Sequence, residues 1–181
     1  MTLNFPTGKA QGAYINLDGK LGTFKLSQAD GDATPIDATG LTFGLDIANA
    51  RQGWLALSKG ARDWQPIDAE NQWGIKPSDE HKPGVELDIH CHEGAFGDEP
   101  VRAFSGASLA VTNFVAAAAK AAGDLSSVAD TIPTLRVNAV HIKQLGKGSS
   151  VNVDFTMLPR EKWMRRDAPP AVNAADEENW D

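Results

Sequence analysis

Apolar and polar residues alternate with a period of two along much of the chain, a pattern typical of β-strands with one buried face. The alternation is clear in residues 41–47 and again in residues 85–92. In the second run one side carries Val85, Leu87, Ile89 and Cys91, and the other carries Glu86, Asp88, His90 and His92. We expect the apolar side of each strand to face the core and the polar side to face solvent.

A β-hairpin is predicted near the start of the chain. Residues 12–26 form two short apolar runs joined by Asp18-Gly19, a pair that suits a type I′ turn. A later run, residues 53–57, is predicted to return beside the strand at 41–47.

The last predicted elements are two strands, residues 135–145 and 149–158, around Gly146-Lys147-Gly148. The apolar parity of the first strand shifts between Ala139 and Val140, which indicates a β-bulge.

Residues 108–122 carry the one strong helix signal. Ser105 or Ser108 can serve as the N-cap, and Gly123 stands where a left-handed residue commonly ends a helix. The predicted core stripe consists of Val111, Phe114, Val115, Ala118 and Ala122.

The order of these elements suggests a fold. Residues 58–84 show no helical or strand period and are predicted to be a long ordered loop. Without the N-terminal hairpin, the order is three strands, a helix and two strands, as in a five-stranded Greek-key OB barrel. We therefore expect a mainly β domain over residues 1–166, an OB-like barrel with one helix and an extra N-terminal hairpin. Other α+β domains share this order.

Charge is distributed unevenly along the 181 residues. The chain has 17 Lys and Arg against 24 Asp and Glu, a net charge of −7, which argues against a broadly basic duplex-DNA binder or a polybasic membrane-surface protein. Five of the acids and none of the bases lie in residues 167–181, which leaves 19 acids against 17 bases in residues 1–166. The acidic tail has little to bury, so we expect it to be disordered.

The chain carries one cysteine, Cys91, and therefore no internal disulfide. Its start has no secretory signal pattern, and its longest apolar run, residues 109–119, has about half the length that a membrane span needs. We expect a soluble protein of a reducing, cytoplasmic compartment, without a membrane partner.

Aromatic and basic residues are interleaved in the middle of the chain, a combination that single-stranded nucleic acid requires for stacking and for phosphate contacts. The candidate stacking residues are Trp54, Trp64 and Trp73, and the candidate cations beside them are Arg51, Lys59, Arg62 and Lys76. Further cations from the last hairpin would be Arg136, Lys143 and Lys147. The alternative is that Trp54 packs in the core, that the other two tryptophans pin the loop, and that the cations are ordinary surface charges.

The chain ends in a short acidic run with one aromatic residue: Asp176, Glu177, Glu178, Asn179, Trp180 and Asp181. This segment resembles the tails of bacterial and phage single-stranded DNA-binding proteins. The resemblance implies a non-catalytic protein of replication or recombination, located in the host cytoplasm if phage-encoded. Its implied partners are single-stranded DNA and, through the tail, replication and recombination proteins, with self-association left open. A merely solubilising tail is the alternative.

Two other functions stay open. His90 and His92 lie on the same side of one predicted strand, a familiar start for a zinc site, and His81, His141 or a carboxylate would have to complete it. A metal-dependent enzyme is therefore one alternative, although other catalytic signatures are absent and no cofactor is expected. A virion structural or assembly protein is the other.

Overall fold

The computed structural model describes residues 13–28, 32–58, 61–67, 74–126 and 129–166, and every structural statement below refers to them. The strands are β1 Tyr14–Asp18, β2 Thr23–Ser27, β3 Ala33–Ile36, β4 Thr42–Leu45, β5 Arg51–Ser58, β6 Ala61–Pro66, β7 Lys82–His90, β8 Val101–Gly106, β9 Thr131–Ile132, β10 Thr134–Leu145, β11 Gly148–Met157 and β12 Met164–Arg165. The helix is α1 Leu109–Ala122, and two short 3-10 turns are η1 Ile47–Asn49 and η2 Arg160–Lys162.

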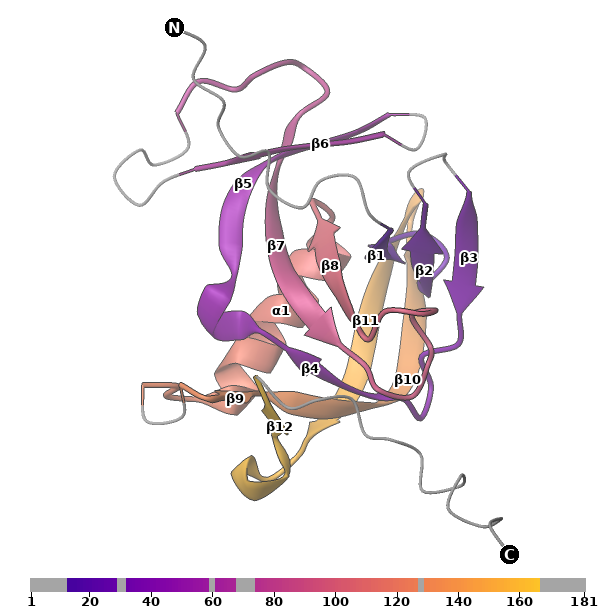
Figure 1. The fold of residues 1–181 in the computed structure, drawn as a ribbon. Coiled ribbons are helices and arrows are strands. Elements are labelled where there is room, and N and C mark those ends of the chain that lie inside the picture. Colours follow the sequence, from indigo (N-terminus) through magenta and orange to yellow (C-terminus); the bar gives the residue numbers. More distant parts are fainter. Residues whose placement is uncertain (1–12, 29–31, 59–60, 68–73, 127–128, 167–181) are drawn as a thin grey trace, which may run out of the picture.

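Ten of these strands form one sheet that curls around α1 as a half-barrel (Figure 1). The main path runs β11-β10-β4-β7-β8-β1-β2-β3, and β5 pairs with both β7 and β6. Neighbouring strands are antiparallel except β1 and β8, which are parallel. The small sheet β12-β9 lies apart from this path. The expectation of a mainly β protein with one helix is confirmed.

Four phenylalanines hold the half-barrel to its helix. Phe24, Phe43 and Phe104 come from three strands, and Phe114 comes from α1; each is at most 3% exposed. The Phe114 ring centroid lies 6.0 to 6.4 Å from the other three. Such a cluster is the centre of the core, since loss of one buried aromatic side chain costs about 3–5 kcal/mol.

The helix agrees with its prediction. Ser108 is the N-cap, its side chain accepting a hydrogen bond from the Val111 N–H, and Gly123 ends the helix with a positive φ of 70°. All five residues of the predicted core stripe are buried. Among the described residues, no helix has the length and apolar character required to cross a bilayer.

The first hairpin is present, but its predicted two-residue turn is wrong. Asp18 pairs with Thr23, so four residues form the loop, and Gly22 rather than Gly19 takes the positive φ, at 63°. The Asp18 carboxylate accepts hydrogen bonds from the N–H groups of Lys20 and Leu21, which stabilises the longer loop.

The predicted extra N-terminal hairpin is joined to the main sheet, because β1 pairs with β8 in parallel and β2 continues the sheet to β3. The predicted neighbour of β5 was wrong as well: β5 pairs with β6 and β7, whereas β4 pairs with β10 and β7. The segment 58–84 is not only a loop, since it contains β6 and the start of β7. The strands β3 and β8 were not predicted, since both runs lack a clear apolar alternation.

The last hairpin follows its prediction closely. The β10 and β11 strands pair from Leu135 with Met157 to Leu145 with Gly148, and the register shifts between Val137 and Ala139, within two residues of the predicted bulge. The acidic tail, residues 167–181, lies outside the described residues, and the last described residue is Arg166.

Candidate functional site

The side of the sheet that faces away from α1 is formed by every second residue of β1, β8, β7, β5 and β6, and we call it the outer face. The register places Ser105 opposite Glu86, Glu86 opposite Arg51, and Leu55 opposite both Lys82 and Trp64. Cross-strand partners share a face of a sheet. With Tyr14 of β1 opposite Ala103 of β8, residues from five strands meet on one surface.

A buried carboxylate organises the centre of the outer face. Glu86 is 3% exposed and forms ion pairs with both Arg51 and Arg62. Arg62 also donates a hydrogen bond to the Ser105 hydroxyl at 3.0 Å, and its guanidinium carbon lies 5.4 Å from the centroid of the Tyr14 ring. Arg62 thus ties β6 to β7, β8 and β1, and its charge is already neutralised.

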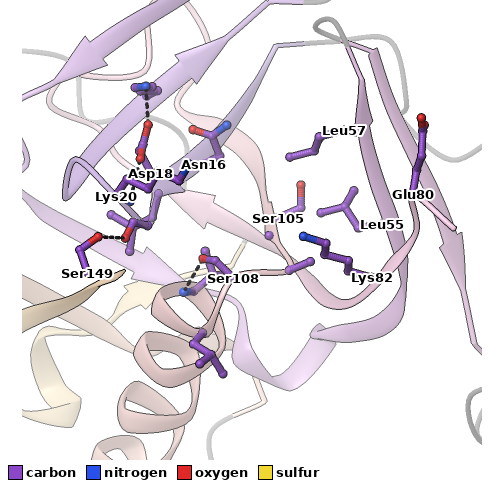
Figure 2. Close-up of a pocket in the computed structure, with 17 residues that line it drawn as sticks. Asn16, Asp18, Lys20, Leu55, Leu57, Glu80, Lys82, Ser105, Ser108 and Ser149 are labelled. Carbon is purple, nitrogen blue, oxygen red and sulfur yellow. Dashed lines mark hydrogen bonds and ion pairs between the residues drawn. The ribbon is translucent and has the colours of Figure 1, made fainter. Parts of the chain in front are cut away.

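A cavity of about 690 Å³ opens beside this cluster, between the first hairpin, β5, the start of α1 and the start of β11 (Figure 2). Leu55, Leu57 and Leu109 contribute apolar surface, and Leu57 is 52% exposed. The polar lining residues include Asn16, Ser105, Ser108 and Ser149.

The charged lining residues of this cavity are Lys20, Lys25 and Lys82 against Asp18 and Glu80, a net charge of +1. Lys25 is held by Asp18 at 2.7 Å. Lys20 and Lys82 are exposed, and neither forms an ion pair with another described residue. They are therefore the cations of the cavity that a bound anion can reach without displacing a carboxylate.

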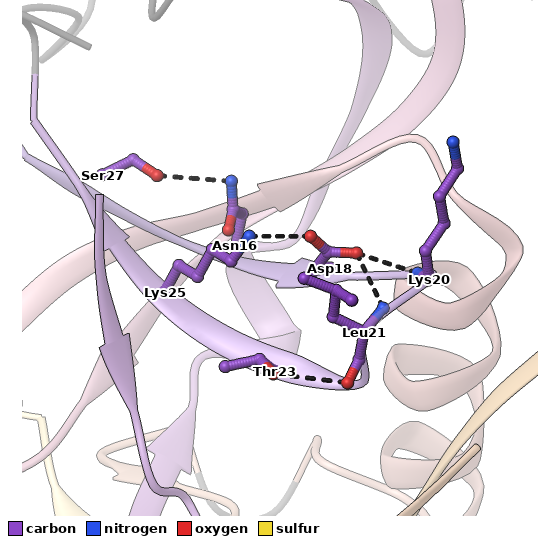
Figure 3. A network of polar contacts seen from close by, with 7 residues as sticks. All are labelled: Asn16, Asp18, Lys20, Leu21, Thr23, Lys25 and Ser27. Carbon is purple, nitrogen blue, oxygen red and sulfur yellow. Dashed lines mark hydrogen bonds and ion pairs between the residues drawn. The ribbon is translucent and has the colours of Figure 1, made fainter. Parts of the chain in front are cut away.

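Asp18 is the hub of the network on the first hairpin (Figure 3). The hydrogen bond from the Lys25 ammonium, together with the two loop N–H groups, lowers the pKa of Asp18 to about 2. Ionised Asp18 fixes the loop between β1 and β2, and the Ser149 hydroxyl donates to the Gly19 carbonyl at 3.5 Å. The loop that carries Lys20 is thereby placed at the cavity.

The predicted tryptophans do not form one platform. Trp64 lies opposite Leu55, on the outer face, and its ring packs over Gly53, where an added Cβ would come within 2.9 Å of it. Trp54 lies opposite Gln65, on the other side of the β5–β6 ribbon. Both side chains are half-buried. Trp73 lies outside the described residues.

The predicted cations fall in different places. Arg51 and Arg62 lie on the outer face, as described, and Lys59 lies outside the described residues. Lys76 precedes β7 and is 3.9 Å from Asp79. Arg136, Lys143 and Lys147 are exposed on β10 and the turn after it; of these, Lys147 is two residues from Ser149 of the cavity. The tail residues Asp176, Glu177, Glu178, Trp180 and Asp181 lie outside the described residues.

Among the described residues, the histidines predicted as metal ligands do not form a cluster with other ligand side chains. His90 is 9% exposed, and burial lowers its pKa. His81, a proposed third ligand, instead bonds Ser78 and Asp63. Within the described ranges, no group of three or more His, Cys, Asp or Glu side chains lies close enough together to hold a metal ion. Cys91 is buried, as its alternation predicted, and burial raises its pKa.

Several residues of the outer face and its cavity were not predicted as site residues, namely Tyr14, Asn16, Lys20, Lys82, Glu86 and Ser105. Glu86 was assigned to a polar strand side, but nothing in the sequence showed that two arginines would cover it. A usable signal existed for Tyr14 and Asn16, because their alternation with Ile15 and Leu17 places them on the side of β1 away from the core.

The cavity thus has an apolar wall, hydroxyl groups and two accessible lysines, and its wall residue Leu55 lies opposite the half-buried Trp64. Comparison with protein-family models, with curated proteins and with solved structures found no match to this chain.

Proposed function

We propose that this protein binds single-stranded DNA on its outer face, through an OB-like barrel. The observation that carries the proposal is the strand order β11-β10-β4-β7-β8 with α1 inserted between β8 and β10. If β4 and β5, joined by η1, are counted as one first strand, the order becomes 5-4-1-2-3, which supports an OB-like five-stranded barrel.

The position of the cavity supports the same function. OB domains bind oligonucleotides on the face of their second and third strands, between the loop after the first strand and the loop after the fourth. On this proposal, those strands correspond to β7 and β8, the first loop to the segment between β5 and β7, which contains β6, and the second loop to residues 146–147. Ser105 of β8, Glu80 of the first loop and Ser149 beside the second all line the cavity.

Binding would combine stacking with phosphate neutralisation. Trp64 offers an aromatic surface beside the apolar wall of Leu55 and Leu57, and Lys20 and Lys82 offer accessible charge. Arg51 is 54% exposed and can turn part of its guanidinium toward a phosphate while it holds Glu86. No step of this function is catalytic, and the acidic tail would recruit replication or recombination proteins in the cytoplasm.

The test is a titration of the full chain with fluorescently labelled oligo(dT), followed by anisotropy at several salt concentrations. We expect the logarithm of affinity to fall linearly with the logarithm of salt concentration, with a slope of about −0.7 per phosphate neutralised on a single strand. Substitution of both Lys20 and Lys82 by Ala should weaken binding and reduce the slope by about 1.4, the value for two lost phosphate contacts.

The matched control is Lys162→Ala, which removes an exposed lysine on η2, away from the outer face. It should leave affinity and slope nearly unchanged. An effect of this single-charge control about half as large as that of the double variant would show that net charge, not this cavity, governs binding. An absence of oligo(dT) binding would end the proposal.

A further inference from the structure

A serine, a histidine and an aspartate form a hydrogen-bonded chain on the loop before β7. The Ser78 hydroxyl lies 2.8 Å from Nδ1 of His81, and Nε2 of His81 lies 3.1 Å from a carboxylate oxygen of Asp63 on β6. His81 is buried, at 5% exposure, whereas Ser78 is exposed. A backbone turn, in which the His81 N–H donates to the Ser78 carbonyl at 3.2 Å, holds serine and histidine together.

The chemistry of the three groups assigns the protons. An ionised Asp63 is an acceptor only, so Nε2 of a neutral His81 carries the proton and donates it. Nδ1 is then the acceptor, and the Ser78 hydroxyl donates to it. The Glu80 N–H donates to the same hydroxyl oxygen at 3.3 Å, which leaves one lone pair of that oxygen for attack. This is the hydrogen-bond arrangement of a serine nucleophile, a base and a carboxylate that orients the base.

The three residues line one cavity of about 400 Å³, which also contains Arg62. Arg62 also lines the cavity; its side chain is 8% exposed and its guanidinium is paired with Glu86, so it adds no uncompensated charge. The cavity therefore combines a hydroxyl that solvent can reach, a buried base and a buried guanidinium.

We propose that Ser78 accepts an acyl group from esters, with His81 as general base and Asp63 as the group that orients His81. The Ser78 oxygen attacks the ester carbonyl and its proton moves to Nδ1 of His81. The resulting tetrahedral species breaks its bond to the leaving alcohol, which takes the proton from Nδ1. Water, deprotonated by the same nitrogen, then attacks the acyl carbonyl. The bond between the acyl carbon and the Ser78 oxygen breaks, the proton on Nδ1 moves to that oxygen, and the acid leaves. This activity is independent of nucleic-acid binding.

The test is incubation of the full chain with p-nitrophenyl acetate, with release of p-nitrophenol followed by absorbance and acetylated peptides quantified by mass spectrometry. Exposed histidines and lysines also react with this ester, so the rate of acetylation at Ser78 is the decisive quantity. Ser150, exposed on β11, is an internal control in the same digest. We expect Ser78 to be acetylated about 10²- to 10⁴-fold faster than Ser150, the range that general-base catalysis supplies.

Two variants and one control separate catalysis from simple exposure. Ser78→Ala should remove the fast phase of p-nitrophenol release, whereas Ser150→Ala should leave it unchanged. Asp63→Asn keeps the shape of an exposed side chain but disturbs the protonation of His81, and it should slow acetylation of Ser78 about 10-fold or more with an unchanged melting temperature. Acetylation of Ser78 at the rate of Ser150, or unaffected by Asp63→Asn in the folded protein, would overturn the proposal.

Discussion

At the scale of single residues, one buried carboxylate determines how much positive charge the outer face presents. Glu86 engages Arg51 and Arg62 together, and a buried ionised group requires such partners because its desolvation is costly. The two arginines therefore serve first to neutralise Glu86 within the fold. Among the described residues of this face and its cavity, the cations left for a phosphate are Lys20 and Lys82, together with the exposed part of Arg51.

Asp18 provides a residue-scale prediction about pH. Its pKa of about 2 lies below the ordinary value of 3.8, mainly because it accepts a hydrogen bond from Lys25. A lowered carboxyl pKa stabilises the folded state above the unfolded pKa, and this stabilisation is lost as the pH falls from about 4 through about 2. Asp18→Asn should thus lower stability at pH 7 by about 1 kcal/mol or less, since the ion pair is partly exposed. The difference from the parent chain should be mostly lost near pH 2 and vanish below it.

Urea unfolding of parent and variant between pH 7 and pH 2 measures this difference. Asp154→Asn is the matched control, because Asp154 is exposed on β11 and has no ion pair with a described residue. A gap between Asp18→Asn and the parent that stayed constant down to pH 2 would show that the ion pair is not its cause.

At the scale of elements, the β5–β6 ribbon has two faces with different surroundings. One face, with Leu55, Arg62 and Trp64, joins the outer face of the main sheet. The other carries Trp54 and Ala56. Two tryptophans that are close in sequence and on neighbouring strands are thereby directed to opposite sides.

This geometry predicts different consequences for the two tryptophans. Trp64→Ala should reduce affinity for oligo(dT) by about 1–3 kcal/mol, the usual value for one lost stacking contact, with little dependence on salt. Trp54→Ala should affect stability rather than affinity. Anisotropy titration together with thermal unfolding of both variants separates the two effects. If Trp54→Ala weakened binding as much as Trp64→Ala, the nucleic acid would not be confined to the outer face.

At the scale of the whole molecule, charge is separated between the folded part and the tail. Residues 1–166 carry a net charge of −2, and residues 167–181 carry −5. Of the four bases between residues 160 and 166, two are engaged in the fold: Arg160 donates to the carbonyls of Ala122 and Asp124, and Arg166 pairs with Asp46. Residues 160–166 are thus fixed to the domain, and the acids of the tail come after them in the sequence.

Truncation after Arg166 tests the role of these acids. The melting temperature should stay nearly unchanged, because Arg166 keeps its contacts and the removed segment has few apolar residues. Affinity for oligo(dT) should rise, most strongly at low salt, because a tethered anion no longer competes for positive surface. Trp180→Ala, which keeps every charge, is the control and should bind oligo(dT) like the parent. Weaker binding after truncation would place the tail in the binding site.

The sequence alone determined the elements whose signals are local. The helix α1 was predictable with its cap and its buried stripe, because residues three and four apart lie on one helix face whatever surrounds them. The hairpin β10–β11 was predictable because a short Gly-containing turn joins two alternating strands. Cys91 and the apolar side of β7 were predictable from alternation, since successive side chains of a strand must point to opposite faces.

Only the tertiary structure decided which elements pair with one another and which side chains come into contact. Pairing of β1 with β8 and of β5 with β7 joins residues far apart in sequence, and the energy of such pairing depends on the complete sheet rather than on either strand. For the same reason, the sequence could not show that Glu86 neutralises Arg62, that Trp54 and Trp64 face apart, or that Ser78 and His81 meet Asp63. The sequence shows which side chains carry a charge. Whether such a charge is already paired with an opposite charge depends on neighbours that only the fold brings close.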